Sequence, residues 1–244
     1  MKAKLGIAPI AWWNDDLEEL SDDVSLQECL RQASVAGFTG METGRRFPMD
    51  MDELGPLLTK HSMSPLATKP KLTEAEIAVY GRKVSDFADW CLHNGMPLAY
   101  HHHMAAVIET EDELDLLMKH SSVPLLFDTG HMAFAGGDVL RVIEKHHNRI
   151  SHVHVKDVRR NVIDEINREQ ESFLDAVVKG AFTVPGDGSL DFEGIVKALA
   201  ANGYEGWFVV EAEQNPKISP PLEMAKKGHK ELIRVMALSG YAVE

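Results

Sequence analysis

Amphipathic stretches with helix-boundary signals alternate with short apolar runs along this chain. Capping signals open four such stretches, at Ser25–Glu28, Thr73–Glu76, Thr110–Glu113 and Asp191. Their side chains can accept the free amide protons of a first helical turn. A run rich in Val, Ile, Leu or Phe follows each stretch. This alternation predicts βα units that build one parallel sheet.

Seven of the apolar runs are suited to strands that are buried on both faces. They lie at Leu5–Ala8, Phe38–Glu42, Met63–Ala67, Pro97–His101, Val123–Asp128, Ile150–Val155 and Trp207–Glu211. An eighth strand fits near Phe182–Val184, although Pro185-Gly186-Asp187-Gly188 behind it is typical of an irregular turn. A length of 244 residues without a Gly/Ser linker suits one barrel. We therefore predict a single α/β domain over residues 1–244, a (β/α)8 barrel.

Five of these predicted strands end on a residue that can hold a metal ion or a proton. The five residues are Glu42, His101, Asp128, His154 and Glu211. Because parallel strands of one sheet place their carboxyl ends on one edge, these side chains are expected to meet there.

The composition indicates an enzyme that acts on a small molecule. A net charge of −13 disfavours nucleic acid and anionic membranes as partners. No apolar run approaches the roughly 20 residues that span a bilayer, and the N-terminus lacks a signal-peptide core. Cys29 and Cys91 lie on apolar faces of predicted helices, which favours buried thiols in a reducing cytosol. A cytoplasmic protein is expected.

Two of the strand ends each carry a pair of residues that could act together. Asp128 is either a metal ligand with the imidazole of His131 beside it, or the cap of the next helix with His131 packed against it. His154 and Lys156 share one face of a strand, and we expect Lys156 to reach the mouth of the barrel. The alternative for this pair is the polar outer face of an edge strand.

Two other strand ends offer imidazoles and carboxylates. His101 and His103 fall on one side of their strand, unless the histidine run is a solvated loop. Neutral imidazole suits Mn, Co, Fe or Zn better than Mg. Glu211 at the end of a buried strand needs a cation, whereas Glu213 is expected to form a salt bridge or a helix cap.

Several of these motifs together resemble the inosose dehydratase family of xylose-isomerase-like TIM barrels. They are Gly6-Ile7-Ala8-Pro9-Ile10 with Trp12 and Asn14-Asp15-Asp16, Tyr100-His101-His102-His103-Met104, Asp128-Thr129-Gly130-His131, His152-Val153-His154-Val155-Lys156-Asp157, Thr183-Val184-Pro185-Gly186-Asp187-Gly188 and Val209-Val210-Glu211-Ala212-Glu213-Gln214. The resemblance runs from residue 5 to about residue 230. It implies the removal of water from 2-keto-myo-inositol, to give a trihydroxycyclohexanedione, in inositol catabolism with Mn²⁺ or Co²⁺.

The resemblance also implies roles for individual residues. The metal ligands of the superfamily match His101, Asp128, His154 and Glu211. Substrate contacts match His131 and Arg160, and Trp12, Asn14 and Glu42 lie where further contacts are expected. Trp12 either stacks on a sugar-like ring or simply packs.

Two departures from the family pattern are visible. His101 stands where the sugar epimerases carry a second acid/base carboxylate, which argues against two-sided proton transfer. Between Leu66 and Thr73 a short link stands where the family carries a helix and the fourth barrel strand. Either that stretch of the protein is missing from the sequence, or the barrel is shortened and lacks one βα unit near residues 66–72.

Dehydration beside a ketone proceeds most easily through an enediolate, which a divalent ion would stabilise. Glu211 or Lys156 would take the α-proton, and His103 or His131 would protonate the departing hydroxyl. The rival hypotheses are a sugar isomerase or epimerase and a metal-binding paralogue without catalysis. An abasic-site endonuclease is disfavoured by the acidic charge. The sequence leaves a homo-oligomer open.

Overall fold

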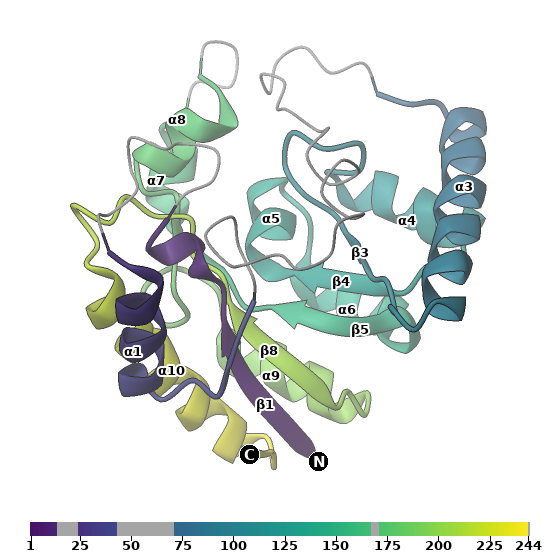
Figure 1. Cartoon of the computed structure of the whole chain (residues 1–244). Helices are drawn as coiled ribbons and strands as arrows, with labels where there is room; N and C mark the ends of the chain where they lie inside the picture. The colour runs from purple at the N-terminus through teal and green to yellow at the C-terminus, as the bar shows by residue number, and fades with distance from the viewer. Residues whose placement is uncertain (14–23, 43–70, 167–170, 244) are drawn as a thin grey trace.

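One parallel sheet forms the centre of the molecule (Figure 1). The computed structural model describes residues 1–13, 24–42, 71–166 and 171–243. The strand order is β2-β1-β8-β5-β4-β3, and β9 pairs with β1 beside the N-terminus. Their bounds are β1 Lys2–Ile7, β2 Gly40–Met41, β3 Tyr100–His101, β4 Leu125–Asp128, β5 Ile150–His154, β8 Gly206–Val210 and β9 Ala242–Val243. Six of the predicted strands are thereby confirmed, and Met63–Ala67 lies outside the described residues.

Local signals set the ends of the helices as predicted. Ser25 caps α1 (Leu26–Ala36), which stops at Gly37 with a φ of 101°. Capping boxes at Thr73 and Thr110 begin α3 (Glu74–His93) and α4 (Glu111–His120), and Asp191 caps α9 (Phe192–Ala201). The remaining helices are η1 Pro9–Ala11, α5 Thr129–Phe134, α6 Val139–His146, η3 His147–Arg149, α7 Arg160–Asp164, α8 Phe173–Val178 and α10 Pro221–Leu238.

The longer helices cover the outside of the sheet (Figure 1). Helix α1 packs on α10, α10 on α9, α9 on α6, and α3 on α4. Cys29 and Cys91 are buried free thiols in this layer, as predicted. Burial raises the pKa of Cys29 to about 12. Among the described helices, none is both long and apolar enough to cross a membrane.

The sheet differs from a regular closed barrel in two places. In the described part of the chain, β2 and β3 are the two ends of the strand order and do not pair with each other. The predicted eighth strand exists as β7 (Phe182–Thr183), but it pairs antiparallel with β6 (Asp157–Val158) instead of joining the main sheet. Strands β5 and β8 pair directly in its place.

The carboxylate of Asp157 explains why the β7 segment folds back on β6. It is fully buried and accepts five backbone N–H groups, those of Val158, Gly186, Gly188, Ser189 and Leu190. Since each of these donors needs an acceptor once it is buried, the turn wraps around Asp157. Gly188 permits this close approach, because an added Cβ would lie 2.4 Å from Asp157 Oδ1.

Candidate metal centre at the carboxyl ends of the strands

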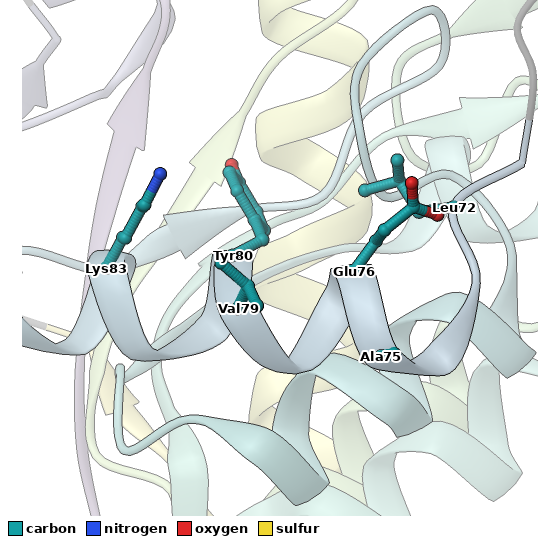
Figure 2. A pocket seen from close by; sticks show the side chains of 6 residues that line it. All are labelled: Leu72, Ala75, Glu76, Val79, Tyr80 and Lys83. Carbon is teal, nitrogen blue, oxygen red and sulfur yellow. The ribbon is translucent and has the colours of Figure 1, made fainter.

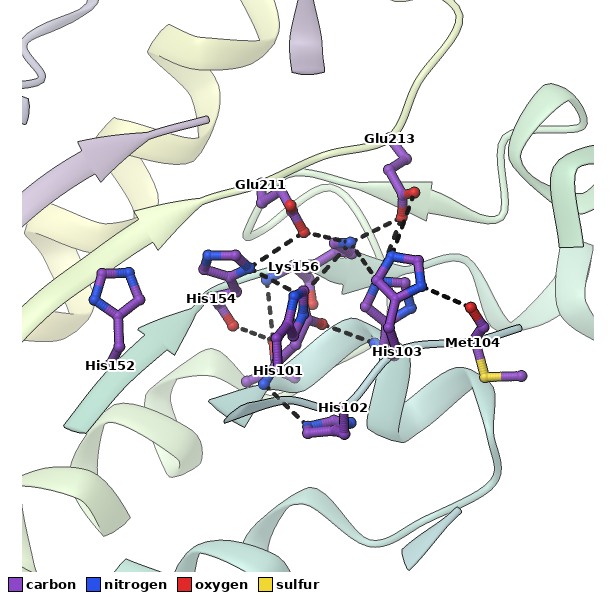
Figure 3. A network of polar contacts seen from close by, with 12 residues as sticks. His101, His102, His103, Met104, His152, His154, Lys156, Glu211 and Glu213 are labelled. Carbon is purple, nitrogen blue, oxygen red and sulfur yellow. Dashed lines mark hydrogen bonds and ion pairs between the residues drawn. The ribbon is translucent and has the colours of Figure 1, made fainter. Parts of the chain in front are cut away.

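The five strand-end residues predicted to converge do meet at one edge of the sheet. His154 is central: its Nε2 lies 2.9 Å from Glu42 Oε1, and its Nδ1 lies 3.3 Å from Glu211 Oε2. Asp128 Oδ2 lies 3.5 Å from His154 Nδ1 and 3.6 Å from His101 Nε2. Figure 3 shows His101 of β3, His154 of β5 and Glu211, directly after β8, gathered around one place. We call His101, Asp128, His154 and Glu211 the cage.

Asp128 serves both of the roles that the sequence left open. Its Oδ1 accepts the backbone N–H of His131 at 2.8 Å and so caps helix α5. Its Oδ2 points into the cage and has no hydrogen-bond partner among the described residues. The helix cap therefore fixes the carboxylate so that one oxygen remains free for a ligand.

One buried atom of each cage residue lacks a hydrogen bond within the described part of the molecule. These atoms are His101 Nε2, Asp128 Oδ2, His154 Nδ1 and Glu211 Oε2. Buried polar atoms are almost always paired. Glu211 Oε2 does lie 2.6 Å from Lys156 Nζ, but the convergence of all four atoms without a hydrogen bond among them indicates a position for a bound cation. Donor atoms that bind one ion tetrahedrally at about 2.1 Å lie roughly 3.4 Å apart. Three of the separations in the cage, 3.3, 3.5 and 3.6 Å, are close to that spacing.

The donor set also fits a divalent ion chemically. Two imidazoles and two carboxylates suit Mn, Co, Fe or Zn. Glu42 binds the outer nitrogen of His154, which is the usual position for a carboxylate that orients a metal-binding histidine. His131 is the alternative to His154, because the ligand atoms of His101, Asp128, His131 and Glu211 all lie within 4.8 Å of one another, whereas His154 meets that criterion with Glu42 and His152. We prefer His154, since His131 Nε2 already contacts Lys156 Nζ at 2.9 Å.

The protonation states of the cage follow from burial and its neighbours. Burial lowers the pKa of His101 to about 4, so this imidazole is neutral near pH 7. Burial by itself would raise the pKa of Asp128, but Lys156 and His131 hold it well below its usual range. Burial would likewise lower the pKa of His154, but Glu211 and Asp128 raise it. Binding of a metal ion at His154 would therefore release a proton.

Lys156, which was expected to reach the mouth of the barrel, lies against the cage at the carboxyl ends of the strands and is shielded from solvent. Its side chain is fully buried, and Nζ lies 2.6 Å from Glu211 Oε2 and 2.8 Å from Glu213 Oε2. The carboxylates attract the ammonium inward, where their charge would otherwise be unpaired. Glu213 forms the predicted salt bridge, with Lys156 as its partner.

His131 and His103 lie beside this ion pair. Their ring centroids are 3.7 Å apart, and Phe173 packs against both rings. His103 Nδ1 lies 2.6 Å from the carbonyl oxygen of Met104, so Nδ1 carries a proton and donates to that oxygen, and Nε2 faces Glu213 Oε1 at 3.9 Å. Sequence reasoning missed Phe173, because nothing in the sequence placed α8 near the strand ends.

His102 is a second residue whose role the sequence did not reveal. It is fully buried on the opposite side of β3 from His101, and its Nε2 accepts the backbone N–H of Asp128 at 3.2 Å. It thus ties β3 to the residue that both caps α5 and faces the cage. The run of three histidines was the available signal, but their alternation alone does not say what His102 contacts.

The structure places the residues expected to contact substrate in different surroundings. Trp12 is fully buried and its Nε1 donates to Gln32 Oε1, so its ring packs and offers no open face. Asn14 lies outside the described residues. Glu42 is one-third exposed and also binds His152 at 3.2 Å. Arg160 is exposed at the start of α7 and, among the described contacts, its side chain bonds no cage residue.

Two surface cavities lie apart from the cage. One of about 460 Å³ is lined by Arg160 together with residues at the starts of α6 and α9. Another of about 430 Å³ lies along α3 (Figure 2), lined by Leu72, Ala75, Glu76, Val79, Tyr80 and Lys83. Neither cavity is lined by a cage residue, so neither is the site that the cage indicates.

A parallel α/β sheet with His, Asp and Glu side chains gathered at its carboxyl edge is typical of a known class of α/β barrel. The sequence profile of the xylose isomerase-like TIM barrel family matches residues 51–236. The chain therefore belongs to the xylose isomerase-like TIM barrel family. The IolI protein, solved with a bound zinc atom, shares this fold with a TM-score of 0.62 at 14% identity, over 97% of this chain and 98% of IolI.

Within that family, the chain is similar to proteins named inosose dehydratase. The inosose dehydratase of Geobacillus thermodenitrificans is 38% identical over 94% of this chain and 96% of its own. The rhizopine catabolism protein MocC of Rhizobium meliloti is 37% identical over 99% of this chain and 91% of its own. The MocC alignment spans 295 positions, more than the 244 residues of this chain, so the relative carries internal residues without a counterpart here. This agrees with the predicted shortening.

Proposed function

We propose that this protein is a metal-dependent hydro-lyase that removes water from a keto-cyclitol, 2-keto-myo-inositol, to give a trihydroxycyclohexanedione. The observation that carries the proposal is the cage of four buried donor atoms without hydrogen bonds. The names of the relatives, at up to 38% identity, support this substrate class. The protein would act in inositol catabolism in the cytoplasm, with Mn²⁺ or Co²⁺ held by His101, Asp128, His154 and Glu211.

A bound divalent ion would supply a Lewis acid that stabilises negative charge on the ketone oxygen. Glu211 is the better placed of the two candidate bases, because its carboxylate is ionised and lies at the cage. Lys156 keeps its proton, since burial is outweighed by Asp128, Glu211 and Glu213, which raise its pKa. In the reaction the α-carbon would give its proton to Glu211 as the carbon–oxygen bond at the β-carbon breaks.

The departing hydroxyl must receive a proton in order to leave as water. His103 is better placed than His131 to supply it, because its side chain is partly open to solvent whereas His131 is fully buried. Burial and the positive charges of His103 and Lys156 also lower the pKa of His131 well below its usual range. With Glu211 as base and His103 as acid, the proton count balances as the loss of one water molecule.

The proposal is tested by adding inosose to the purified chain with Mn²⁺ or Co²⁺ and recording ultraviolet absorbance. A dehydratase accumulates a strongly absorbing diketone, whereas an epimerase produces no such chromophore. We expect absorbance to rise with metal present, to stop with EDTA, and to resume when Mn²⁺ is restored. Metal bound at full stoichiometry without any absorbance change refutes the lyase.

The second candidate is a metal-binding paralogue that has lost catalysis. The observation that favours it is the shortened chain, since the MocC alignment is longer than the chain and β2 and β3 do not pair within the described residues. Mn²⁺ binding without turnover of inosose or related cyclitols would support this candidate. Epimerised product detected by nuclear magnetic resonance would instead support a sugar epimerase.

A further inference from the structure

The ammonium of Lys156 lies among three carboxylates at the carboxyl ends of the strands. Its Nζ lies 2.6 Å from Glu211 Oε2, 2.8 Å from Glu213 Oε2 and 3.5 Å from Asp128 Oδ2. Its side chain is fully buried, so water does not solvate the ammonium. The ammonium is therefore held by carboxylates, two of which belong to the cage.

The path of the lysine side chain is built into the neighbouring helix. An added Cβ at Gly130 of α5 would lie 2.5 Å from Lys156 Cγ, so the helix offers bare backbone where the stem passes. Thr129 Oγ1 accepts the backbone N–H of Lys156 at 3.0 Å and donates to its carbonyl at 2.7 Å. Both contacts fix where the ammonium lies.

A divalent ion in the cage would use two of the oxygens that already face this ammonium. Glu211 Oε2 and Asp128 Oδ2 are among the four atoms without a hydrogen bond, and both lie within 3.5 Å of Lys156 Nζ. A cation at their other side would share their negative charge with the ammonium and repel it. Without any cation, these buried carboxylates would be destabilised.

We propose that Lys156 is an internal counter-ion of the cage. In the metal-free protein its ammonium holds Asp128 and Glu211 in ligand geometry, and by repelling a divalent ion it lowers the affinity of the cage for that ion. This inference rests on the proposed metal site and adds the residue that sets its affinity. Lys156 acts through the carboxylates, so it is a positioning residue.

The test compares the full-length wild-type chain with Lys156→Met, which keeps the length of the side chain and removes its charge. Lys197→Met is the matched control, because it makes the same charge change on α9, at an exposed ion pair with Glu193. Mn²⁺ affinity is measured by titration calorimetry on EDTA-treated, dialysed protein. Thermal unfolding is followed in EDTA and in Mn²⁺.

We expect Lys156→Met to bind Mn²⁺ at least tenfold more tightly than wild type, and to unfold at a lower temperature in EDTA. Lys197→Met should match wild type in Mn²⁺ affinity. A purely structural lysine would instead weaken Mn²⁺ binding when it is lost, so the direction of the change separates the two roles. If Lys156→Met fails to fold, Lys156→Gln, which retains a hydrogen-bond donor, is measured in its place.

The inference is overturned if the variant binds Mn²⁺ with a dissociation constant within twofold of wild type, or with a larger one. Either result leaves the proposed metal site intact. Absence of Mn²⁺ binding in both wild type and variant overturns the proposed metal site together with the inference. Binding that occurs in the variant alone supports the inference, because it shows that the ammonium blocks the ion.

Discussion

The carboxylate of Asp157 offers the sharpest test of how the turn beside the cage is held. Its Oδ1 accepts three backbone N–H groups and its Oδ2 accepts two, those of Gly186 at 3.2 Å and Gly188 at 2.9 Å. An asparagine placed with its oxygen at the Oδ1 position keeps the first three bonds. Its NH₂ group then faces the other two donors, which become unpaired.

The expected magnitude follows from those two donors. A fully buried N–H group left without an acceptor costs about 1–3 kcal/mol; the bonds of Gly186 and Gly188 are only part-buried, so Asp157→Asn should lower the free energy of unfolding by about 2 kcal/mol, the lower end of the range for two donors. The opposite amide orientation also leaves two donors unpaired, those of Val158 and Leu190, because Ser189 N–H still donates to the carbonyl oxygen of Val158 at 2.8 Å. The free energy is measured by urea denaturation followed by far-ultraviolet circular dichroism, with the m-value checked for constancy.

Asp191→Asn is the matched control for this substitution. Asp191 is exposed and accepts the backbone N–H of Gly194 at 3.0 Å as the N-cap of α9. Asparagine caps helices about as well as aspartate, so a change within about 1 kcal/mol is expected from the same loss of charge. A loss below about 1 kcal/mol in Asp157→Asn would refute the reasoning, because the two N–H groups would then have other acceptors.

Three further outcomes are expected. Asp128→Asn should lose Mn²⁺ retention in elemental analysis after dialysis, because the carboxylate at the centre of the cage becomes neutral; normal retention would contradict its role as a ligand. Thr110→Ala should lower the free energy of unfolding by about 0.5–2 kcal/mol in urea titration, since α4 loses its capping box; an unchanged value would mean that the cap is redundant. Cys29 and Cys91 are buried, so neither thiol of the native protein should react with a thiol reagent at pH 8, whereas both should react in the urea-unfolded protein. Rapid labelling of the native protein would show that this helical layer opens.

The sequence by itself determined the helix ends and which strand ends carry donor atoms. Helix caps act over three or four residues, so Ser25, Thr73 and Thr110 could be read without knowledge of the fold. Parallel strands share one edge for their carboxyl ends, so Asp128 and His154 could be expected to meet once alternation was recognised.

Only the tertiary structure decided how those residues divide their contacts. One oxygen of Asp128 caps α5 while the other faces the cage, and no sequence pattern separates the two oxygens of a carboxylate. The burial of Lys156 depends on Glu213, far away in the chain, and the pairing of β7 with β6 depends on bonds between Asp157 and a distant turn that includes Gly188. Electrostatic and hydrogen-bond demands of buried groups are satisfied in three dimensions, and local sequence does not encode which distant partner satisfies them.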